Sequence, residues 1–245
     1  MDDAQHFRNK GKYYKNLYNA EINWFQPKDE NGVWVTYPRD GRLTQDFACV
    51  ESNPYQQGWF VPHDIEGMVE QMGGINAVKA DLEEFFGNTP ENLMWNNYYN
   101  HANEPVHHVP FIFNRIGYPE LTQKWVRHIC TNAYKNSVEG IVGNEDVGQM
   151  SAWYVLASIG IYPLCPGEAR YEICSPLFDK VTIHLPNEKT FSIVVKNNSE
   201  SNIYIENILL NNRDQTEYFI SHKDILQGGK LTLDMRSKPL NRQAK

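Results

Sequence analysis

Two adjacent acids, Glu145 and Asp146, stand in the segment GNEDVGQMSAW, directly before a run of apolar residues. The run is typical of a helix, whose free N–H groups and dipole would keep Asp146 ionised. An ionised carboxylate can act as a general base. The same pattern also arises as an ordinary charge cluster at a helix N-terminus, and this segment alone leaves both interpretations open.

A second carboxyl group, that of Glu51, lies in the segment CVESNPYQQGWFVPHD. Its neighbours along the chain include Val50, Tyr55, Trp59 and Phe60. A carboxyl group in apolar surroundings tends to stay protonated, which suits a general acid. The alternative is a glutamate on a surface loop without a catalytic role.

A third loop, in the segment NYYNHANEPVHHVPFIFNRIG, contains His101, Asn103, Glu104, His107 and His108. Asparagine and glutamate supply the oxygen ligands that calcium prefers. The adjacent pair His107-His108 lacks the spacing of a zinc site. A hydrogen-bonded loop that caps a helix is the alternative.

Together the three loops offer the two carboxyl groups that glycoside hydrolysis requires. One protonates the leaving oxygen, and the other activates water or attacks carbon. An aromatic content of 13% fits platforms for sugar rings, and it fits a large core equally well. We therefore predict a carbohydrate-cleaving site.

Helical segments position these loops. Residues 64–86 form two helical runs separated by Gly73-Gly74, and residues 120–134 carry apolar residues on one face. Residues 149–162 are apolar nearly all round, which predicts a buried helix. Loops held between rigid helices are common places for reactive groups.

After about Leu164 the pattern changes to short alternating or β-branched runs divided by Asn, Gly and Pro. Such runs predict an antiparallel sheet. Helices that precede strands, rather than alternate with them, predict an α+β fold. We expect a helical region over 1–163 and a small antiparallel β domain over 164–245.

Composition excludes several classes of protein. The chain has 245 residues and a net charge of -7, which argues against nucleic acid as a partner. No apolar run is long enough to cross a bilayer. The polar N-terminus predicts no signal peptide and resembles the interior of a helix. The four cysteines lack metal-site spacing, and their disulfide state stays open.

Several motifs resemble signatures of one family. They are GNEDVGQMSAWYVLASIGIYPLCPG, SPLFDKVTIHLP, NEPVHHVPFIFNRIG, GWFVPHDIEGMVEQMGG and ESNPYQQ, the last as a variant of E-G-N-x-W-Q. In order and separation they look like glycoside hydrolase family 92, the calcium-dependent exo-acting α-mannosidases. The resemblance covers nearly the whole chain. It implies hydrolysis of terminal α-linked mannose from glycans with inversion of configuration.

The resemblance also assigns roles in catalysis. Glu51 aligns with the general acid, and Asp146 aligns with the general base, which Asn144 could assist. It implies a calcium ion held by Asn103, Glu104 and Asp146, which would grip two mannose hydroxyls and favour a distorted ring.

Four residues are expected to bind the sugar on the same basis: Gln56, Trp59, His101 and Glu104. Ser52 and other residues after the acid depart from the family pattern, so contacts to the leaving group are expected to differ.

The family fold is an N-terminal β-sandwich, an (α/α)6 barrel and small C-terminal β elements. This chain is therefore expected to be a partial (α/α)6-type helical barrel followed by the β domain, and part of a longer enzyme. Its expected partners are a mannose-containing glycan and either the missing N-terminal domain or a second copy bound through exposed helix faces. A secreted or periplasmic location is implied by analogy.

Two other functions compete with this prediction. One is a non-catalytic carbohydrate-binding or assembly fragment without turnover. The other is a polysaccharide lyase, which would want a Tyr or His base and positive charge for a uronate. No Arg cluster of that kind stands out in this acidic chain.

Overall fold

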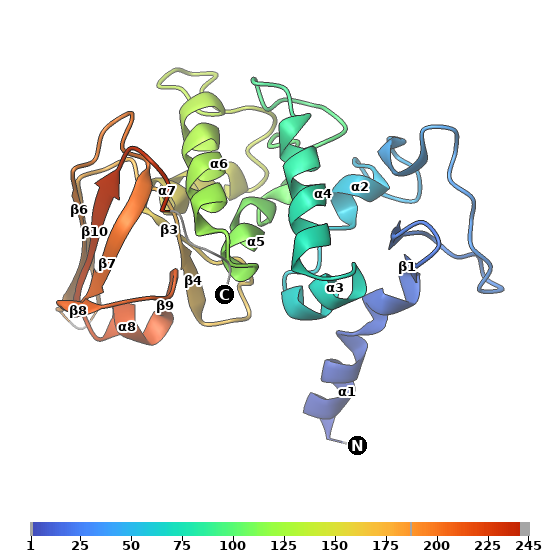
Figure 1. Ribbon diagram of the computed structural model, residues 1–245, viewed down its shortest axis with the longest axis horizontal. Coiled ribbons are helices and arrows are strands. Elements are labelled where there is room, and N and C mark those ends of the chain that lie inside the picture. The colour runs from blue at the N-terminus through green and yellow to red at the C-terminus, as the bar shows by residue number, and fades with distance from the viewer. Residues whose placement is uncertain (1, 187, 241–245) are drawn as a thin grey trace. The chain divides into compact units, whose positions relative to one another are not determined.

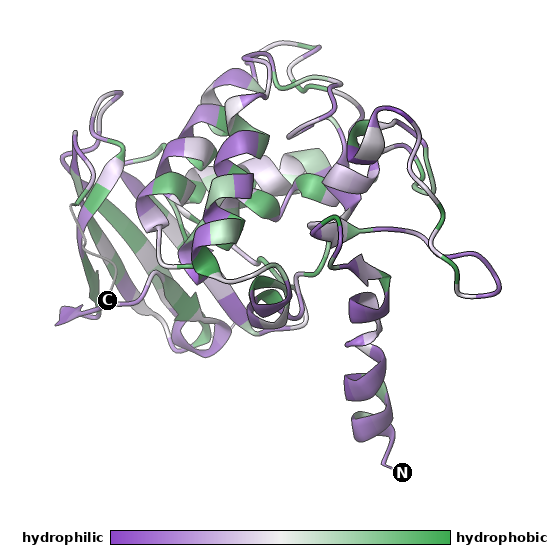
Figure 2. Cartoon of the chain, turned by 45° about the vertical axis from the view of Figure 1, so that its right-hand side comes forward, coloured by the Kyte–Doolittle hydropathy of each residue, from purple (hydrophilic) through white to green (hydrophobic). Residues whose placement is uncertain are grey.

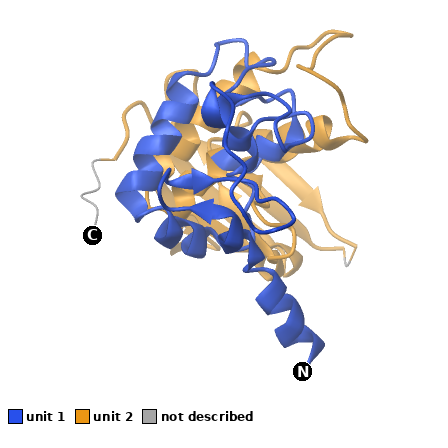
Figure 3. Ribbon diagram, turned by 90° about the vertical axis from the view of Figure 1, so that its right-hand side faces the viewer, with its two compact units in different colours: residues 1–109 blue, residues 110–245 orange. Residues whose placement is uncertain are grey.

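The computed structural model describes residues 2–186 and 188–240, which belong to two compact units (Figure 3). The first unit spans residues 1–109 and the second residues 110–245. None of the helices in the described ranges is both long and apolar enough to cross a membrane.

The first unit consists of short helices joined by long loops, with one small two-stranded sheet. Its elements are α1 (Asp3–Lys10), the 3-10 helix η1 (Tyr13–Leu17), β1 (Tyr18–Asn19), β2 (Trp24–Phe25), η2 (Gly41–Leu43), α2 (Pro54–Gln57), α3 (Ile65–Gln71), α4 (Ile75–Gly87) and η3 (Glu104–Val106). The expected N-terminal helix exists only as α1 and η1. Figure 2 shows that α1 is largely hydrophilic, and none of its residues is buried.

Helices α3 and α4 confirm the two helical runs predicted over 64–86. Asp64 starts α3, where its Oδ1 accepts a hydrogen bond from Gly67 N at 3.1 Å. Gly73 and Gly74 separate the helices because both adopt the left-handed region, with φ of 91° and 98°. Helix α4 then buries one face at helical spacing, formed by Val78, Leu82, Phe85 and Phe86.

The second unit combines helices with two sheets in its described residues. Its elements are α5 (Val109–Arg115, which begins at the unit boundary), α6 (Pro119–Asn132), α7 (Gln149–Ile159), β3 (Ile161–Tyr162), β4 (Arg170–Ile173), β5 (Lys180–His184), β6 (Thr190–Lys196), β7 (Tyr204–Leu210), β8 (Arg213–Asp214), β9 (Phe219–Ser221), α8 (His222–Leu226) and β10 (Gly229–Arg236).

The larger sheet has the order β5-β6-β10-β7-β8, and Figure 1 shows β6, β10 and β7 side by side. The smaller sheet has the order β3-β4-β9. Pairing is antiparallel as predicted, except that β10 pairs with β6 in parallel. The prediction of a purely antiparallel domain is wrong at this pair, because the last strand enters between β6 and β7. Phe191, Ile193 and Val195 alternate into the core along β6.

Helix α6 confirms the helix predicted over 120–134, whereas the run over 149–162 contains two elements. Helix α7 ends at Ile159, and left-handed Gly160 leads into the strand residues Ile161 and Tyr162. Helix α7 is not buried all round, because Val155 is 55% exposed. The apolar composition of α7 therefore predicted more burial than the structure shows.

Helix α6 contacts β7 and α7 contacts β3, so the helices of the second unit pack with the strands that follow them. The compact units consequently divide at Val109/Pro110, while the change from helices to strands falls near residue 160. The division into 1–163 and 164–245 stays a prediction about domains, and so does the (α/α)6 arrangement of the helices.

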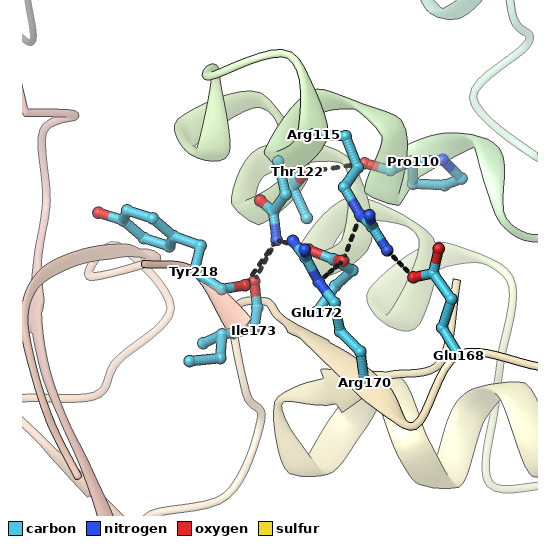
Figure 4. Close-up of polar contacts among 9 residues, drawn as sticks. Pro110, Arg115, Thr122, Glu168, Arg170, Glu172, Ile173 and Tyr218 are labelled. Carbon is cyan, nitrogen blue, oxygen red and sulfur yellow. Dashed lines mark hydrogen bonds and ion pairs between the residues drawn. The ribbon is translucent and has the colours of Figure 1, made fainter. Parts of the chain in front are cut away.

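A buried ion network joins α5 to β4 (Figure 4). Arg115 Nε donates to Glu172 Oε1 at 2.7 Å, and Arg170 Nε donates to the same oxygen at 2.8 Å. Arg115 Nη2 donates to Glu168 as well. Glu172 is completely buried, so its carboxylate is cut off from water, and the two guanidinium groups replace the lost hydration with hydrogen bonds and positive charge.

Candidate active site

Glu51 lies in an exposed position directly before α2, with its backbone in the left-handed region at φ 55°. Residues other than glycine seldom adopt this conformation, and surrounding bonds must hold it. Asn103 Nδ2 donates to the Glu51 backbone oxygen at 2.7 Å, and Asp46 N donates to Ser52 O at 2.8 Å. The first bond connects the loop of the predicted acid to the turn of the predicted metal ligands.

A cavity of about 230 Å³ contains Glu51 in its wall. The other lining residues are Val50, Gln57, Phe60, Asn103, Glu104 and Pro105. The structure thus brings Asn103 and Glu104 together with Glu51 inside the first unit. Val50 and Phe60, both expected as apolar neighbours of Glu51, line the cavity. Gln57 and Pro105 stand in the quoted motifs, and the sequence alone had given them no role.

Gln56 and Trp59 lie behind this cavity wall rather than in it. Gln56 is buried, and its Nε2 donates to Asn96 O at 2.7 Å and Tyr98 O at 2.8 Å. Trp59 is completely buried, with its ring 5.1 Å from that of Trp24. Gln56 thus joins α2 to the 96–98 segment, Trp59 packs against core aromatic rings, and their predicted contact with sugar stays a prediction.

The histidines of the 101–108 turn are buried as well. Tyr99 Oη lies 2.8 Å from His101 Nδ1, His107 Nε2 lies 3.0 Å from His101 O, and His108 Nε2 lies 2.8 Å from Trp59 O. Burial lowers the pKa of His108 to about 4 and holds the pKa of His101 well below its ordinary value. The neutral imidazoles of His101 and His108 therefore help to fix this turn, and sugar binding by His101 stays a prediction.

The turn offers oxygen atoms suited to calcium. Because Asn103 Nδ2 donates to Glu51 O, the Oδ1 end of this amide remains as the acceptor. Nearby in the chain, Asn100 Oδ1 is buried without a hydrogen-bond partner among the described residues. Carboxylate and amide oxygens fit calcium, which takes about six to eight oxygen ligands. No group of three or more His, Cys, Asp or Glu side chains able to hold an ion occurs in the described residues.

The predicted base lies in the second unit, in the exposed turn before α7. Asn144, Glu145 and Asp146 are all exposed. Asp146, Val147 and Gly148 adopt the left-handed region in succession, with φ of 47°, 58° and 92°. Such a run is costly for a β-branched residue, and strained backbone of this kind concentrates at functional sites.

Glu145, and not Asp146, occupies the N-terminus of α7. Glu145 Oε1 accepts a hydrogen bond from Ser151 N at 3.0 Å, and Oε2 accepts one from Ser151 Oγ at 2.9 Å. The free N–H group of Ser151 is thus used by Glu145, and the predicted influence of the helix end on Asp146 stays a prediction. Because the turn is tight, Glu145 rather than Asp146 accepts the hydrogen bond from Ser151 N. The order of residues alone did not reveal this.

Comparisons with known proteins show the family of the chain. The family model "Glycosyl hydrolase family 92 catalytic domain" matches residues 1–237. The family GH92 α-mannosidase BT3965 of Bacteroides thetaiotaomicron is 31% identical, with a TM-score of 0.91, over 99% of this chain and 32% of its own. The inverting mannosidase BT2199 of the same organism is 34% identical, with a TM-score of 0.87, over 97% of this chain and 34% of its own.

A protein of Arthroderma benhamiae described as an uncharacterized secreted glycosidase is 27% identical over 96% of this chain and 32% of its own length. The chain thus spans about a third of the relatives that it matches. Because the family model covers nearly all of it, the chain belongs to glycosyl hydrolase family 92.

Proposed function

We propose that this chain is part of a glycoside hydrolase that releases terminal α-linked mannose from glycans with inversion of configuration. Family membership and the α-mannosidase neighbours support the reaction class and the sugar. The observation that carries the proposal is the cavity of Glu51, where an exposed carboxyl group meets Asn103 and Glu104.

In the proposed reaction Glu51 is the general acid and gives its proton to the glycosidic oxygen as the bond to the anomeric carbon breaks. Asp146, assisted by Asn144, is the general base and takes a proton from the water that attacks this carbon from the opposite face. The products are mannose of inverted configuration and a free alcohol, as in other inverting glycosidases.

We further propose calcium as the cofactor, held by Asn103 and Glu104 with Asp146 as a further ligand. The oxygen donors of the 100–104 turn support this choice. A bound calcium ion would supply positive charge to sugar hydroxyl groups. Glu104, Gln56, Trp59 and His101 are also proposed to bind the sugar.

The helices are proposed to belong to an (α/α)6 barrel of a longer enzyme, since the relatives extend well beyond the matched region. A missing N-terminal domain or a second copy is the proposed protein partner. A secreted or periplasmic location is proposed because a relative is described as secreted.

The test is mannose release from α-linked mannobiose with calcium present. Glu51→Gln and Asp146→Asn are each expected to lower turnover by about a hundredfold or more, because each removes a proton transfer. Glu70→Gln is the control, because it makes the same change at an exposed glutamate on α3, and we expect it to leave turnover unchanged. Equal turnover in Glu51→Gln and Glu70→Gln would overturn the assignment of the acid.

A non-catalytic carbohydrate-binding fragment is the second candidate, favoured by the coverage of only 32% of the relatives. Calorimetry distinguishes the two functions. Mannose binding by the chain with no release from mannobiose would support the binding fragment and contradict hydrolysis by this chain.

A further inference from the structure

A second cavity, of about 210 Å³, lies in the first unit beside the Glu51 cavity. Its lining is mostly apolar and includes Leu17, Phe25, Ala48, Cys49, Pro54 and Val61. Ligand sites are typically concave and apolar with a few placed polar groups. This cavity is therefore large enough and apolar enough to take a small ring or alkyl group.

The two cavities share part of their walls. Gln57 and Phe60 line both of them. Ser52 Oγ donates to Gln57 Oε1 at 3.2 Å, and the Phe60 ring meets the His108 ring edge-to-face at 5.4 Å. A ligand bound at Glu51 that extends along Gln57 and Phe60 would therefore reach the apolar cavity.

The polar groups in the lining are mostly used inside the protein. Gln26 Nε2 donates to Val35 O at 2.9 Å, and its Oε1 accepts from Asn19 Nδ2 at 2.5 Å. Tyr14 Oη donates to Asp64 Oδ2 at 2.8 Å. A second sugar needs partners for several hydroxyl groups, which would otherwise be desolvated at a cost. The cavity consequently suits an apolar group better than a sugar.

The far wall is held firmly. Trp24 Nε1 donates to Pro54 O at 2.8 Å. A Cβ atom at Gly58 would lie 2.6 Å from the Trp24 ring, so α2 and Trp24 approach as closely as glycine permits. This wall is preformed, which reduces the cost of ordering it around a ligand.

We propose that this cavity is a leaving-group subsite for α-mannosides whose aglycone is apolar, such as an aryl or alkyl group. The position follows from chemistry, since a general acid protonates the leaving oxygen and the leaving group then extends on its side. The inference rests on the proposed function for the role of Glu51, and the lining itself defines the class of aglycone.

Cys49 provides a probe of the cavity that does not depend on turnover. Its thiol is half-buried in the lining, and burial raises its pKa, so labelling is done at alkaline pH. Cys130 and Cys174 are buried, and Cys165→Ser removes the remaining half-buried thiol. Benzyl methanethiosulfonate is then used to label Cys49 in the Cys165→Ser chain.

Phenyl α-mannoside is expected to slow this labelling several-fold, whereas methyl α-mannoside at the same concentration leaves it unchanged. Equal protection by the two glycosides, or none by either, overturns the subsite. Protection by phenol as strong as that by phenyl α-mannoside also overturns it, since the cavity would then bind rings without reference to the sugar.

A cavity-filling variant tests the same point by affinity. Cys49→Leu is expected to weaken phenyl α-mannoside binding, measured by calorimetry, about tenfold, because the larger side chain takes the space of the ring and the ring is no longer buried there. Its affinity for methyl α-mannoside should not change. Cys165→Leu is the matched control, and circular dichroism confirms that both variants fold. Equal weakening for both glycosides would contradict the subsite.

The two proposals fail separately. If phenyl α-mannoside protects Cys49 selectively but the chain releases no mannose, the subsite stands and hydrolysis by this chain fails. If Glu51-dependent release occurs without selective protection, the hydrolase stands and the subsite is wrong.

Discussion

The side-chain amide of Asn103 has two roles, one for its nitrogen and one proposed for its oxygen. Its Nδ2 holds the backbone of Glu51 at 2.7 Å, and its Oδ1 is the proposed calcium ligand. The left-handed conformation of Glu51 gives the first task a physical purpose, because a strained residue needs an external bond to stay in place.

Asn103→Asp separates these tasks, because aspartate keeps the oxygen ligand and loses the N–H donor. We expect turnover of α-linked mannobiose to fall about tenfold, as one positioning hydrogen bond is lost. Calcium affinity measured by calorimetry should be retained or increased. A loss of calcium affinity with unchanged turnover would show that the amide serves the metal alone.

Val147 carries strain that can be relieved. It is fully exposed and β-branched in the left-handed region, where asparagine is tolerated far better. Val147→Asn should raise the free energy of unfolding by about 1 kcal/mol in chemical denaturation. Val138→Asn is the matched control, since Val138 is equally exposed outside that region, and it should have almost no effect. Equal effects would mean that the turn stores no strain.

At the scale of elements, the N-terminus of α7 depends on a cap from outside the helix. Gly148 precedes the helix and has no side chain, so Glu145 supplies the acceptor for Ser151 N. The same side chain thereby fastens the turn that presents Asp146.

Glu145→Ala should lower the free energy of unfolding by about 1 kcal/mol, the usual effect of losing a helix cap. Glu139→Ala, an exposed acid in the preceding loop, should change it by less than about 0.5 kcal/mol. Urea denaturation of both variants measures the difference. No difference between them would contradict capping by Glu145.

At the scale of the whole chain, buried neutral histidines make stability depend on pH. The folded-state pKa of His108 is about 4, against an ordinary value of 6.5. Between these values the unfolded chain binds a proton that the folded chain does not. The contribution of His108 to the free energy of unfolding is therefore fully present above pH 6.5. It is lost as the pH falls toward 4, by about 3 kcal/mol in all.

His108→Gln removes this titration and keeps a donor for Trp59 O. Its free energy of unfolding, measured by urea denaturation from pH 7 to pH 4, should decline less steeply than that of the parent chain. Gln5→Asn, an exposed change without a titrating side chain, is the control and should leave the slope unaltered. If the free energy of unfolding of His108→Gln fell with pH as steeply as that of the parent chain, His108 would be excluded as a source of the pH dependence.

Many of the helices and strands were predictable, because apolar periodicity and the residues that end an element, such as glycine and proline, act over a few positions. The glycines after α3 and the apolar face of α4 follow from their spacing. The burial of α7 did not follow, since apolar composition cannot show that Val155 faces solvent. The parallel pairing of β10 with β6 did not follow either, because it joins segments far apart in the chain.

By itself the sequence determined the two helices within 64–86, the helix within 120–134, the family and the residues proposed for chemistry, because periodicity and motifs keep residue types at fixed spacing. Only the tertiary structure decided that Asn103 holds Glu51, that Glu145 and not Asp146 caps α7, and that an apolar cavity adjoins the Glu51 cavity. These features depend on backbone angles and on contacts between residues such as Asn103 and Glu51, which are far apart in the chain. The spacing of residues along the chain therefore does not predict them.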